Sequence, residues 1–563
     1  MNRFRKISLL SVLLFATYTT NAQHLADSTA VKVDRLFSKW EGNDRPGCVV
    51  GIIRDGQPLY TKGFGLAQLE NKSQNTPESI YYMCSVSKQF TGYTIALLVN
   101  EGKIKLDADI HIYLPWLPHF DQRPITVRNL LHHTSGIRDD IMLARFYGLG
   151  AEGILTQQAA LKMIARQRTL NFKPGEKFSY SNSNYVLLAA IVERISGKSF
   201  KDFTDSVIFK PLNMNSSKFV DDYTTLIPKK ANSYSMEQDG YHNAPQNVYT
   251  LGDGGLFTNA TDLLKWISVF YSTDSLRAKA VELMVKPGKL NNGKALNYAM
   301  GINVNNDKGV RYFTHNGGLA GYRTIMAVYP AQRTGFLIFG NGGDGEVYNK
   351  LTELSEIFIP KPAIKDSQPI STGTPSERIF SDTSQLAKFA GTYVAKNGYQ
   401  VLITKKNGGL YLNGNQALLA DTAASFYLKA RPAVKYRFNM DRQTKTINAL
   451  LSSPILQNPI TLEKIGSQHN EPKRLKEYCG RYYCGELDYY FDVLWKDNAL
   501  WINDKNNNQA KLTLSGKQHL FTAIDYMAHF NVERGRRGEI AGLELNSGEV
   551  SGLIFKKVGV ISK

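Results

Sequence analysis

The sequence predicts an α+β domain that is followed by two small β-barrel-like domains. Strand patterns stand at both ends of the first 360 residues, apolar helical stretches lie between them, and a β-rich unit occurs twice after residue 380. The 563 residues are too many for one hydrophobic core. A hydrophobic content of 42% and an aromatic content of 11% indicate globular domains and exclude a disordered chain.

The N-terminal residues have the pattern of a targeting segment. Arg3, Arg5 and Lys6 precede the apolar run "ISLLSVLLFA", and "TNA" ends it before Gln23. This pattern predicts a cleaved secretory signal over residues 1–22, with an uncleaved anchor as the alternative. The run is short for a bilayer span, and no later segment is apolar enough. We therefore expect a periplasmic or secreted bacterial protein with no transmembrane segment after signal removal.

Two strand pairs frame the first domain. Residues 49–70 contain "VVGIIR" and "PLYTKGFG" on either side of Asp55-Gly56, a strong turn pair. A second pair, "RTIMAVYP" and "TGFLIFGN", is joined around residues 330–333. Strands at both ends of a domain with helices between them favour one antiparallel sheet closed by the two termini.

Two apolar stretches predict buried helices between these strands. "FTGYTIALLVNEGK" is apolar nearly all round and stops at Gly102, and "SNYVLLAAIVERISGK" stops in the same way at Gly197. A helix that is apolar on every face is buried, and glycine is the common residue just past a helix end.

The C-terminal part of the chain is duplicated. Prolines punctuate residues 361–379, which read as a linker. Beyond it, "LAKFAGTY" (386–393) matches "LKEYCGRY" (475–482), and three further pairs follow in the same order: "LYLN" with "LWIN", "RFNM" with "HFNV", and "TLEKI" with "IFKKV". Short alternating strands with Asn, Gly and Asp turns are typical of a small barrel. The predicted domains are 28–360, 380–466 and 472–560.

The tail is expected to shape substrate access and to take no part in the chemistry. It contains no candidate pair of a nucleophile and a base. Contacts between domains of one chain are often modest, so a chain ending near Pro362 is expected to fold alone.

The surface charge excludes one class of partner. The formal net charge is +19, yet no block of Lys and Arg stands out beyond the turn "RGRR" at 534–537. We therefore expect a uniformly solvated basic surface and no nucleic-acid partner. Attraction to anionic lipids or wall polymers is the alternative.

The stretch "YYMCSVSKQF" places Ser85 three residues before Lys88. Residues three apart share a helix face, so the hydroxyl and the amine would meet at the positive N-terminal end of a helix. Serine becomes a nucleophile when a base takes its proton, and lysine can be that base when burial disfavours its charged form. A chain of this length has about two such spacings by chance, and a helix-capping serine is the structural alternative.

Two later motifs add groups that suit this chemistry. Tyr180-Ser181-Asn182 stands before an apolar helix, where a tyrosine could exchange protons with lysine and an asparagine could hold a substrate amide. An aromatic residue beside an N-cap is the alternative. His315-Asn316-Gly317-Gly318 stands before the late strand pair. Gly317 would let a substrate backbone approach, and the N–H groups of Gly318 and Ser85 could form an oxyanion hole, with a plain glycine turn as the alternative.

Four cysteines are too few for a disulfide scaffold, and no spacing suggests zinc. Cys84 is conceivable as a nucleophile, although a buried small residue is the favoured interpretation. Adjacent residues such as His132 and His133 rarely bind one ion, so no metal is expected.

The order Ser-x-x-Lys, Tyr-Ser-Asn and His-Asn-Gly resembles that of the penicillin-recognising serine hydrolases, which include class C β-lactamases, DD-peptidases and D-aminopeptidases. Residues 126–137 and 252–266 also look like segments of this family. The resemblance covers roughly residues 28–360. It implies a β-lactamase-like fold, an acyl-enzyme on Ser85, and no metal or other cofactor.

Carried over by motif, the resemblance assigns a role to each residue. Ser85 is the nucleophile, and Lys88 and Tyr180 share proton transfer, with the ground-state base left open between them. Asn182 positions the substrate amide, and His315 helps to hold charge and substrate on the opposite wall.

One departure from the pattern bears on the substrate. Class C β-lactamases usually carry Lys-Thr-Gly where this chain has His-Asn-Gly. Such a histidine is similar to certain DD-peptidases and D-aminopeptidases, and a hydrolase domain followed by two barrels resembles D-aminopeptidase architecture. The predicted substrates are small peptides or amides, including D-amino-acid compounds, or esters. The alternatives are a β-lactamase and a weakly catalytic protein that binds cell-wall fragments.

Overall fold

The computed structural model describes residues 26–559 except 121–123, 151, 308, 361–382, 396–398, 415, 430, 441–446, 454–458, 465–474, 516–517, 523 and 525–526. The predicted signal at 1–22 and the predicted linker at 361–379 lie outside the described residues. Within the described part, no helix is both long enough and apolar enough to cross a bilayer.

The first domain is built on a six-stranded antiparallel sheet in the order β12-β13-β14-β15-β1-β2. The N-terminal strand β1 pairs with β15 from the far end of the domain, with Val49 opposite Phe339. The predicted closure of the sheet by its two ends is thereby confirmed. The strands are β1 Cys48–Arg54, β2 Gln57–Phe64, β12 Asn303–Asp307, β13 Val310–Leu319, β14 Tyr322–Tyr329 and β15 Thr334–Gly340.

Both faces of this sheet are covered. On one face, α1 Asp27–Phe37 and α10 Glu346–Phe358 pack against alternate strand residues such as Val50 and Ile338. On the other face, Val49 and Leu337 belong to the core of the helical region. Burial of both faces explains why "VVGIIR" reads as a continuous apolar run instead of an alternating one.

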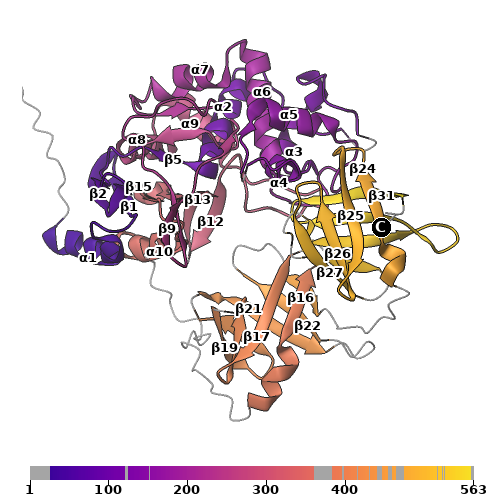
Figure 1. Ribbon diagram of the computed structural model, residues 1–563. Helices are drawn as coiled ribbons and strands as arrows, with labels where there is room; N and C mark the ends of the chain where they lie inside the picture. The colour runs from indigo at the N-terminus through magenta and orange to yellow at the C-terminus, as the bar shows by residue number, and fades with distance from the viewer. Residues whose placement is uncertain are drawn as a thin grey trace, which may run out of the picture.

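The helical region carries the two predicted buried helices, α2 and α6 (Figure 1). Helix α6 ends at Gly197, whose φ of +69° places it in the left-handed region where glycine is favoured, as the sequence predicts. The helices are α2 Lys88–Asn100, α3 Val127–Leu131, α4 Asp140–Arg145, α5 Gln157–Arg166, α6 Asn182–Ser196, α7 Phe200–Thr204, α8 Ala260–Ser268 and α9 Ser275–Met284. Short strands complete the domain: β3 Leu66–Gln68, β4 Ser73–Gln74, β5 Tyr81–Tyr82, β6 Leu155–Thr156, β7 Lys218–Phe219, β8 Tyr234–Glu237, β9 Gly240–Asn243, β10 Val248–Tyr249 and β11 Leu256–Thr258.

Two closed eight-stranded barrels follow, which confirms the predicted pair of β domains. The first barrel comprises β16 Gly391–Ala395, β17 Gln400–Lys406, β18 Gly409–Leu412, β19 Gln416–Thr422, β20 Ser425–Leu428, β21 Arg431–Met440, β22 Ile447–Ser452 and β23 Ile460–Lys464. The second comprises β24 Gly480–Cys484, β25 Tyr489–Lys496, β26 Ala499–Asp504, β27 Gln509–Ser515, β28 His519–Phe521, β29 His529–Arg534, β30 Ile540–Ser547 and β31 Val550–Gly559.

The sequence repeat corresponds to equivalent contacts in the two barrels. The Tyr393 hydroxyl donates to the Phe389 carbonyl at 3.0 Å, and Tyr482 donates to the Tyr478 carbonyl at 2.8 Å. Lys464 in the first barrel likewise donates to the carbonyl of Lys388 at 2.7 Å. Lys557 in the second barrel makes the matching bond to Glu477, also at 2.7 Å.

The two barrels differ in how they attach to the first domain. The first barrel has a hydrophobic cluster of its own, whereas the core of the second barrel is continuous with that of the helical region. Phe146, next to α4, lies 5.2 Å from the ring of Tyr489 in the second barrel. Figure 1 shows this barrel in yellow beside α3 and α4, with the first barrel in orange below it. The expectation of modest contacts between domains is therefore wrong for the second barrel.

Candidate active site

The segment around Ser85 presents one accessible residue from an otherwise buried stretch. Strand β5 leads into a short 3-10 helix, Cys84–Ser87, which continues into α2. Ser85 is partly exposed, while every other residue from Tyr81 to Phe90 is buried. Cys84 has a φ of +49°, a left-handed conformation that costs energy in a residue with a Cβ and that clusters at functional sites. This backbone turns the Ser85 hydroxyl outward.

The helix-capping interpretation of Ser85 is wrong. No side chain caps either the 3-10 helix or α2. Instead, the Lys88 amine donates to Ser85 Oγ at 3.1 Å, as the three-residue spacing predicts.

Lys88 is completely buried and is held by three acceptors. Besides Ser85 Oγ, its Nζ donates to Asn182 Oδ1 at 2.7 Å and to the Asp253 carbonyl at 2.8 Å. The amine also lies 4.9 Å from the centre of the Tyr180 ring, a favourable cation–π distance. These contacts hold the amine beside the nucleophile, and they offset the free-energy cost of burying it.

Tyr180 reaches the same point from the loop before α6. Its buried hydroxyl makes no hydrogen bond within 3.5 Å to a described residue. Burial raises the pKa of Tyr180, and the nearby Lys88 ammonium and Ser85 hydroxyl oppose that rise. The tyrosine ring packs on His133, with ring centres 4.2 Å apart and ring planes tilted by 31°, and His133 Nδ1 accepts from the Ser181 backbone N–H at 3.2 Å. A buried neutral histidine thus supports the segment that carries Tyr180.

Asn182 begins α6 with both ends of its side-chain amide engaged. Its Oδ1 accepts from Lys88, and its Nδ2 donates to Asp139 Oδ2 at 2.8 Å. The Asn182 backbone N–H donates to the same Asp139 oxygen at 2.6 Å. The amide has a second Nδ2 hydrogen, so one donor is left for the predicted contact with a substrate amide.

His315 lies on β13 and is only 3% exposed. Its Nδ1 is 2.7 Å from the Asn316 carbonyl, which can only accept, so Nδ1 carries the proton and Nε2 accepts from the Tyr298 hydroxyl at 3.0 Å. Burial, reinforced by the Lys88 charge, lowers the pKa of His315 to about 3. The imidazole is therefore neutral at pH 7, and the expectation that it helps to hold charge is corrected to an uncharged hydrogen-bonding role.

Gly317 brings β13 against the nucleophile segment. A Cβ at this position would lie 2.6 Å from the Met83 carbonyl oxygen and 2.8 Å from the Cys84 Cβ, closer than real side chains approach. Strand β12 pairs with β13 only as far as Thr314, so the edge of β13 at residues 315–319 is left for other contacts. This arrangement places the Gly318 backbone in the neighbourhood of Ser85, where the sequence predicts an oxyanion hole.

Two buried carboxyl groups lie behind these residues. Burial raises the pKa of Asp140 well above its usual range, and the charge of Asp139 adds to the effect. Burial likewise raises the pKa of Asp253, against the opposing influence of Lys88. Both side chains are buried; the Asp140 carboxyl accepts from Ser183 at 3.1 Å, and the partner of Lys88 at Asp253 is the main-chain carbonyl.

Neither Cys84 nor the adjacent pair His132 and His133 takes the role of nucleophile or joint metal site that was considered for it. All four cysteines have free thiols, and Cys84 is buried, which raises the pKa of its thiol and confirms the interpretation as a small core residue. His132 packs on Gly288 while His133 packs on Tyr180, so the two rings face different groups. Among the described residues, the one group with metal-ligand spacing is the exposed set Glu237, Asp239 and His242, apart from the predicted site.

Sequence reasoning missed three supporting residues, Asp139, Tyr298 and Asp253. Asp139 is the last residue of "HHTSGIRD" (132–139), and Asp253 stands in "GDGG" within a segment that resembles the family. Both segments point to the site, yet which side chain contacts Asn182 or Lys88 depends on tertiary packing. Tyr298 has no motif around it that could have marked it.

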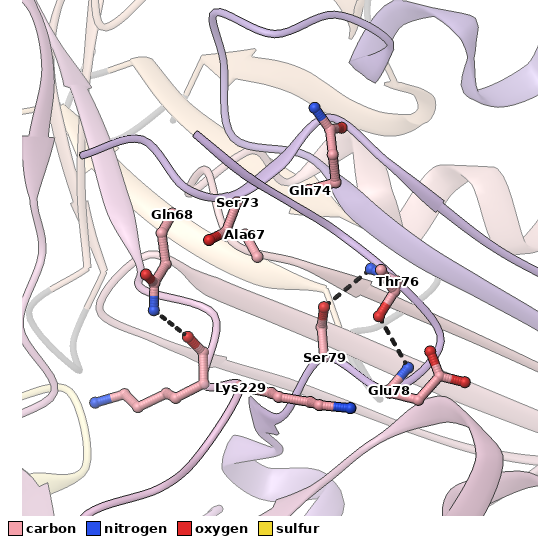
Figure 2. A pocket seen from close by; sticks show the side chains of 9 residues that line it. Ala67, Gln68, Ser73, Gln74, Thr76, Glu78, Ser79 and Lys229 are labelled. Atoms are coloured by element: carbon pink, nitrogen blue, oxygen red, sulfur yellow. Dashed lines mark hydrogen bonds between the residues drawn. The ribbon is translucent and has the colours of Figure 1, made fainter. Parts of the chain in front are cut away.

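A separate cavity of about 350 Å³ lies between β3, β4 and the loop at residues 229–230. Gln68 donates to the Lys230 carbonyl at 2.8 Å, and the Thr76 backbone N–H donates to the Ser79 hydroxyl at 2.9 Å. Figure 2 shows Gln68, Thr76 and Ser79 among the side chains that line the cavity. None of the predicted site residues lines it. The cavity is thus distinct from the cluster at Ser85.

Comparison with known proteins agrees with this geometry. The chain is 28% identical over 406 residues to penicillin-binding protein 4* of Bacillus subtilis (strain 168). The aligned region covers 68% of this chain and 85% of that protein. It is 29% identical over 319 residues to a D-aminopeptidase of Gluconobacter oxydans (strain 621H). The aligned region covers 56% of this chain and 60% of that protein.

Solved structures share the fold. The octameric penicillin-binding protein homologue from Pyrococcus abyssi superposes with a TM-score of 0.54 at 23% identity, over 78% of this chain and 99% of that one. A D-amino acid amidase from Ochrobactrum anthropi SV3 superposes with a TM-score of 0.50 at 21% identity. The superposition covers 59% of this chain and 98% of the amidase chain.

The family comparison covers more than half of the chain. The model of the Beta-lactamase family matches residues 33–359, the part that holds Ser85, Lys88, Tyr180, Asn182 and His315. The match agrees with the resemblance that the three motifs carry and with the observed fold. The chain belongs to the β-lactamase family of serine hydrolases.

Proposed function

We propose that this protein is an exported hydrolase that forms an acyl-enzyme on Ser85 and cleaves small peptides or amides, D-amino-acid compounds among them. The observation that carries the proposal is the 3.1 Å contact between the buried Lys88 amine and the partly exposed Ser85 hydroxyl. A nucleophile within hydrogen-bond reach of a base, which is in turn oriented by further groups, is the arrangement that covalent catalysis needs.

In the proposed acylation, Ser85 Oγ attacks the substrate carbonyl carbon and loses its proton to Lys88 or Tyr180. An ammonium that donates to three acceptors has no lone pair, so the acceptor of the Ser85 proton must be either the uncharged amine form of Lys88 or the ionised phenolate form of Tyr180. The same unit then gives the proton to the leaving amine as the carbon–nitrogen bond breaks. A water molecule then attacks the acyl carbonyl carbon and gives its proton to the same unit. The bond to Ser85 Oγ breaks, Ser85 regains its proton, and the acid product is released.

Backbone N–H groups of Ser85 and Gly318 are proposed to bind the oxyanion of the tetrahedral intermediate. The close approach of β13 to the nucleophile segment at Gly317 supports this pairing. On the opposite side, the remaining Asn182 Nδ2 hydrogen is available to a substrate carbonyl. Neutral His315 and Tyr298 then form the wall behind the substrate.

The preference for peptides and amides rests on two observations. The relatives include proteins named D-aminopeptidase, and the residue at the Lys-Thr-Gly position is a buried, uncharged histidine. A neutral group there offers no cation to the carboxylate of a β-lactam. Esters stay within the proposal because the acylation chemistry of Ser85 is the same.

Export is proposed from the sequence pattern of residues 1–22, with a periplasmic or secreted location. The mass of the protein purified from a native bacterial host tests this part. A mature chain that begins at Gln23 is the expected result, and an intact Met1 in the cytoplasmic fraction would overturn it.

A substrate panel tests the proposed reaction. Purified protein is compared on D- and L-aminoacyl amides, short-chain esters and a chromogenic cephalosporin. We expect turnover of amides or esters that Ser85→Ala abolishes, with slow hydrolysis of the cephalosporin. Efficient cephalosporin hydrolysis alone would identify a β-lactamase instead.

A penicillin-binding protein of low activity is the second candidate, favoured by the match to penicillin-binding protein 4*. It predicts a long-lived adduct with labelled penicillin and no turnover of any substrate in the panel. Cell-wall fragments would then be the partner, and sedimentation with purified peptidoglycan would detect that binding.

A further inference from the structure

The second barrel contacts the residues that hold the catalytic lysine, and these contacts begin at Asp139. One oxygen of the Asp139 carboxylate accepts both Asn182 hydrogen bonds, at 2.6 and 2.8 Å. The other oxygen caps α4 by accepting from the Met142 N–H at 2.9 Å. Because Asp139 takes the Nδ2 end of the Asn182 amide, the Oδ1 end faces Lys88.

The neighbouring residue, Arg138, is locked into the interface with the second barrel. Its side chain has no exposed surface. Its Nε donates to the Ser551 carbonyl at 2.9 Å, and its Nη1 donates to the Thr169 carbonyl at 2.6 Å. Glu486 of the second barrel pairs with the guanidinium at 3.4 Å. A buried charge of this kind is tolerated only while its partners are in place.

Two turns of the second barrel also contact residues 168–171, beside Arg138. Asn171 of the first domain contacts the turn that leads into β31. Its side-chain amide donates to the Glu549 carbonyl at 2.7 Å and accepts from the Ser551 N–H at 2.8 Å. In the turn before β25, Glu486 accepts from the Arg168 N–H at 2.7 Å. Glu486 and Ser551 also contact Arg138, so the same two turns hold both residues 168–171 and the Arg138–Asp139 segment.

The turn before β31 also reaches Asp139 itself. The Asp139 N–H donates to the Glu549 carbonyl at 3.5 Å. Glu549 is partly buried, and burial together with the Asp139 charge raises the pKa of its carboxyl group. The two side chains therefore belong to one electrostatic neighbourhood.

We infer that the second barrel positions the catalytic lysine, acting through the Arg138–Asp139 segment and Asn182. This inference rests on the proposed function. Asp139 is a positioning residue, because it touches Asn182 and α4 while Asn182 touches Lys88. The first barrel contacts the second barrel through Gln400, which donates to the Thr522 and Ala528 carbonyls at 2.9 and 3.0 Å, and the inference gives the first barrel no part in positioning the lysine.

The variants that test the inference lie on both sides of the interface. Asn171→Ala removes the amide that grips the turn before β31, and Glu486→Gln removes the charge that pairs with Arg138. Gln400→Ala is the matched control, because it removes hydrogen bonds to the second barrel at Thr522 and Ala528 instead of at the Arg138–Asp139 segment. Asp139→Asn leaves a single side-chain oxygen, which can cap α4 or hold Asn182 but not both.

The kinetic readout is kcat and KM on the best amide of the panel, with folding checked by circular dichroism. We expect Asn171→Ala and Glu486→Gln each to lower kcat about tenfold with KM nearly unchanged, and Gln400→Ala to match the wild type. In the Asp139→Asn background, neither interface variant should cause a further loss. Unchanged kcat in both interface variants, or losses that multiply in the Asp139→Asn background, would overturn the inference.

Hydrogen exchange gives a readout that does not depend on turnover. The Asn182 backbone N–H, which donates to Asp139, should exchange at least tenfold faster in the two interface variants than in the wild type or in Gln400→Ala. Equal exchange in all four proteins would refute the positioning role. If the wild type shows no turnover and no Ser85 adduct, the proposed function fails, while this exchange result still decides the inference.

Discussion

Lys88 is the residue at which the catalytic contacts converge. Its amine meets Ser85, Asn182 and the Asp253 carbonyl, and the Tyr180 ring lies over it. The sequence predicts the Ser85–Lys88 pair because a spacing of three is a local property of a helix. It does not predict Asp139 or Tyr298, because their contacts join segments far apart in the chain.

Lys88 and Tyr180 are expected to act as one proton-transfer unit. Each of Lys88→Ala and Tyr180→Phe should lower kcat/KM by roughly a thousandfold, within the range for loss of general acid–base catalysis. Because both changes disable the same unit, the double variant should lose little more than either single one. Measurement of kcat/KM for the four proteins gives the coupling. A double variant whose loss equals the product of the single losses contradicts the shared unit.

Buried neutral histidines should make the protein less stable in acid. Burial lowers the pKa of His132 to about 4 and that of His315 to about 3. In the unfolded chain each histidine takes up a proton near pH 6.5, whereas in the folded chain it stays neutral until the pH approaches its lowered pKa. The free energy of unfolding is therefore highest above pH 6.5 and decreases as the pH falls from 6.5 toward the folded-state pKa values. At pH 5 each histidine would account for about 2 kcal/mol of the loss.

Denaturant unfolding at pH 7 and pH 5 measures this effect. His132→Phe keeps a ring on Gly288 and removes the titrating group, so its free energy of unfolding should fall less between the two pH values. An equal fall in wild type and variant would show that His132 does not contribute.

The elements that frame the site were predictable to different degrees. Helices α2 and α6 and the pairs β1–β2 and β14–β15 follow from apolar patterning, Asp55-Gly56 and the helix-ending glycines. The approach of β13 to the nucleophile segment was not predictable in detail. It depends on sheet register and on the Thr324 hydroxyl, which donates to the Met83 carbonyl at 2.8 Å.

Gly317→Ala tests the contact between β13 and that segment. The added Cβ would meet backbone at 2.6 Å, so the strand must move away from Met83 and Cys84. We expect a loss of about 1–3 kcal/mol in stability, as overpacking usually causes, and a drop in kcat/KM of at least tenfold. Gly409→Ala in the first barrel, where the nearest atom is 3.6 Å away, is the control. If Gly317→Ala kept the wild-type kcat/KM, the space between Gly317 and residues 83–84 would be shown to accept a side chain.

At the scale of the whole molecule, the repeat predicts two barrels but not their unequal attachment. Both units carry the same internal contacts, such as the Tyr393 and Tyr482 hydrogen bonds. The difference lies in a few residues that contact the first domain, including Glu486 and Tyr489, and that have no marked pattern in the sequence. Interfaces between domains are set by shape, which one sequence alone does not display.

Truncation after Pro362 should therefore damage the first domain, contrary to the expectation from the sequence. Removal of the second barrel exposes Phe146 and leaves the Arg138 guanidinium without Ser551 and Glu486. We expect the truncated chain to have a lower Tm and poor solubility. A soluble truncated protein with the Tm and probe reactivity of the full chain would refute this view of the interface.

The central claim is that Ser85 is the nucleophile, and covalent labelling tests it most directly. The full chain is treated with a fluorophosphonate probe, its intact mass is measured, and the adduct is located by peptide mapping. The contacts of Ser85 with Lys88 predict one adduct per chain, on Ser85, that is absent from Ser85→Ala while the fold persists. An adduct on Cys84, or undiminished labelling of Ser85→Ala, would contradict the claim.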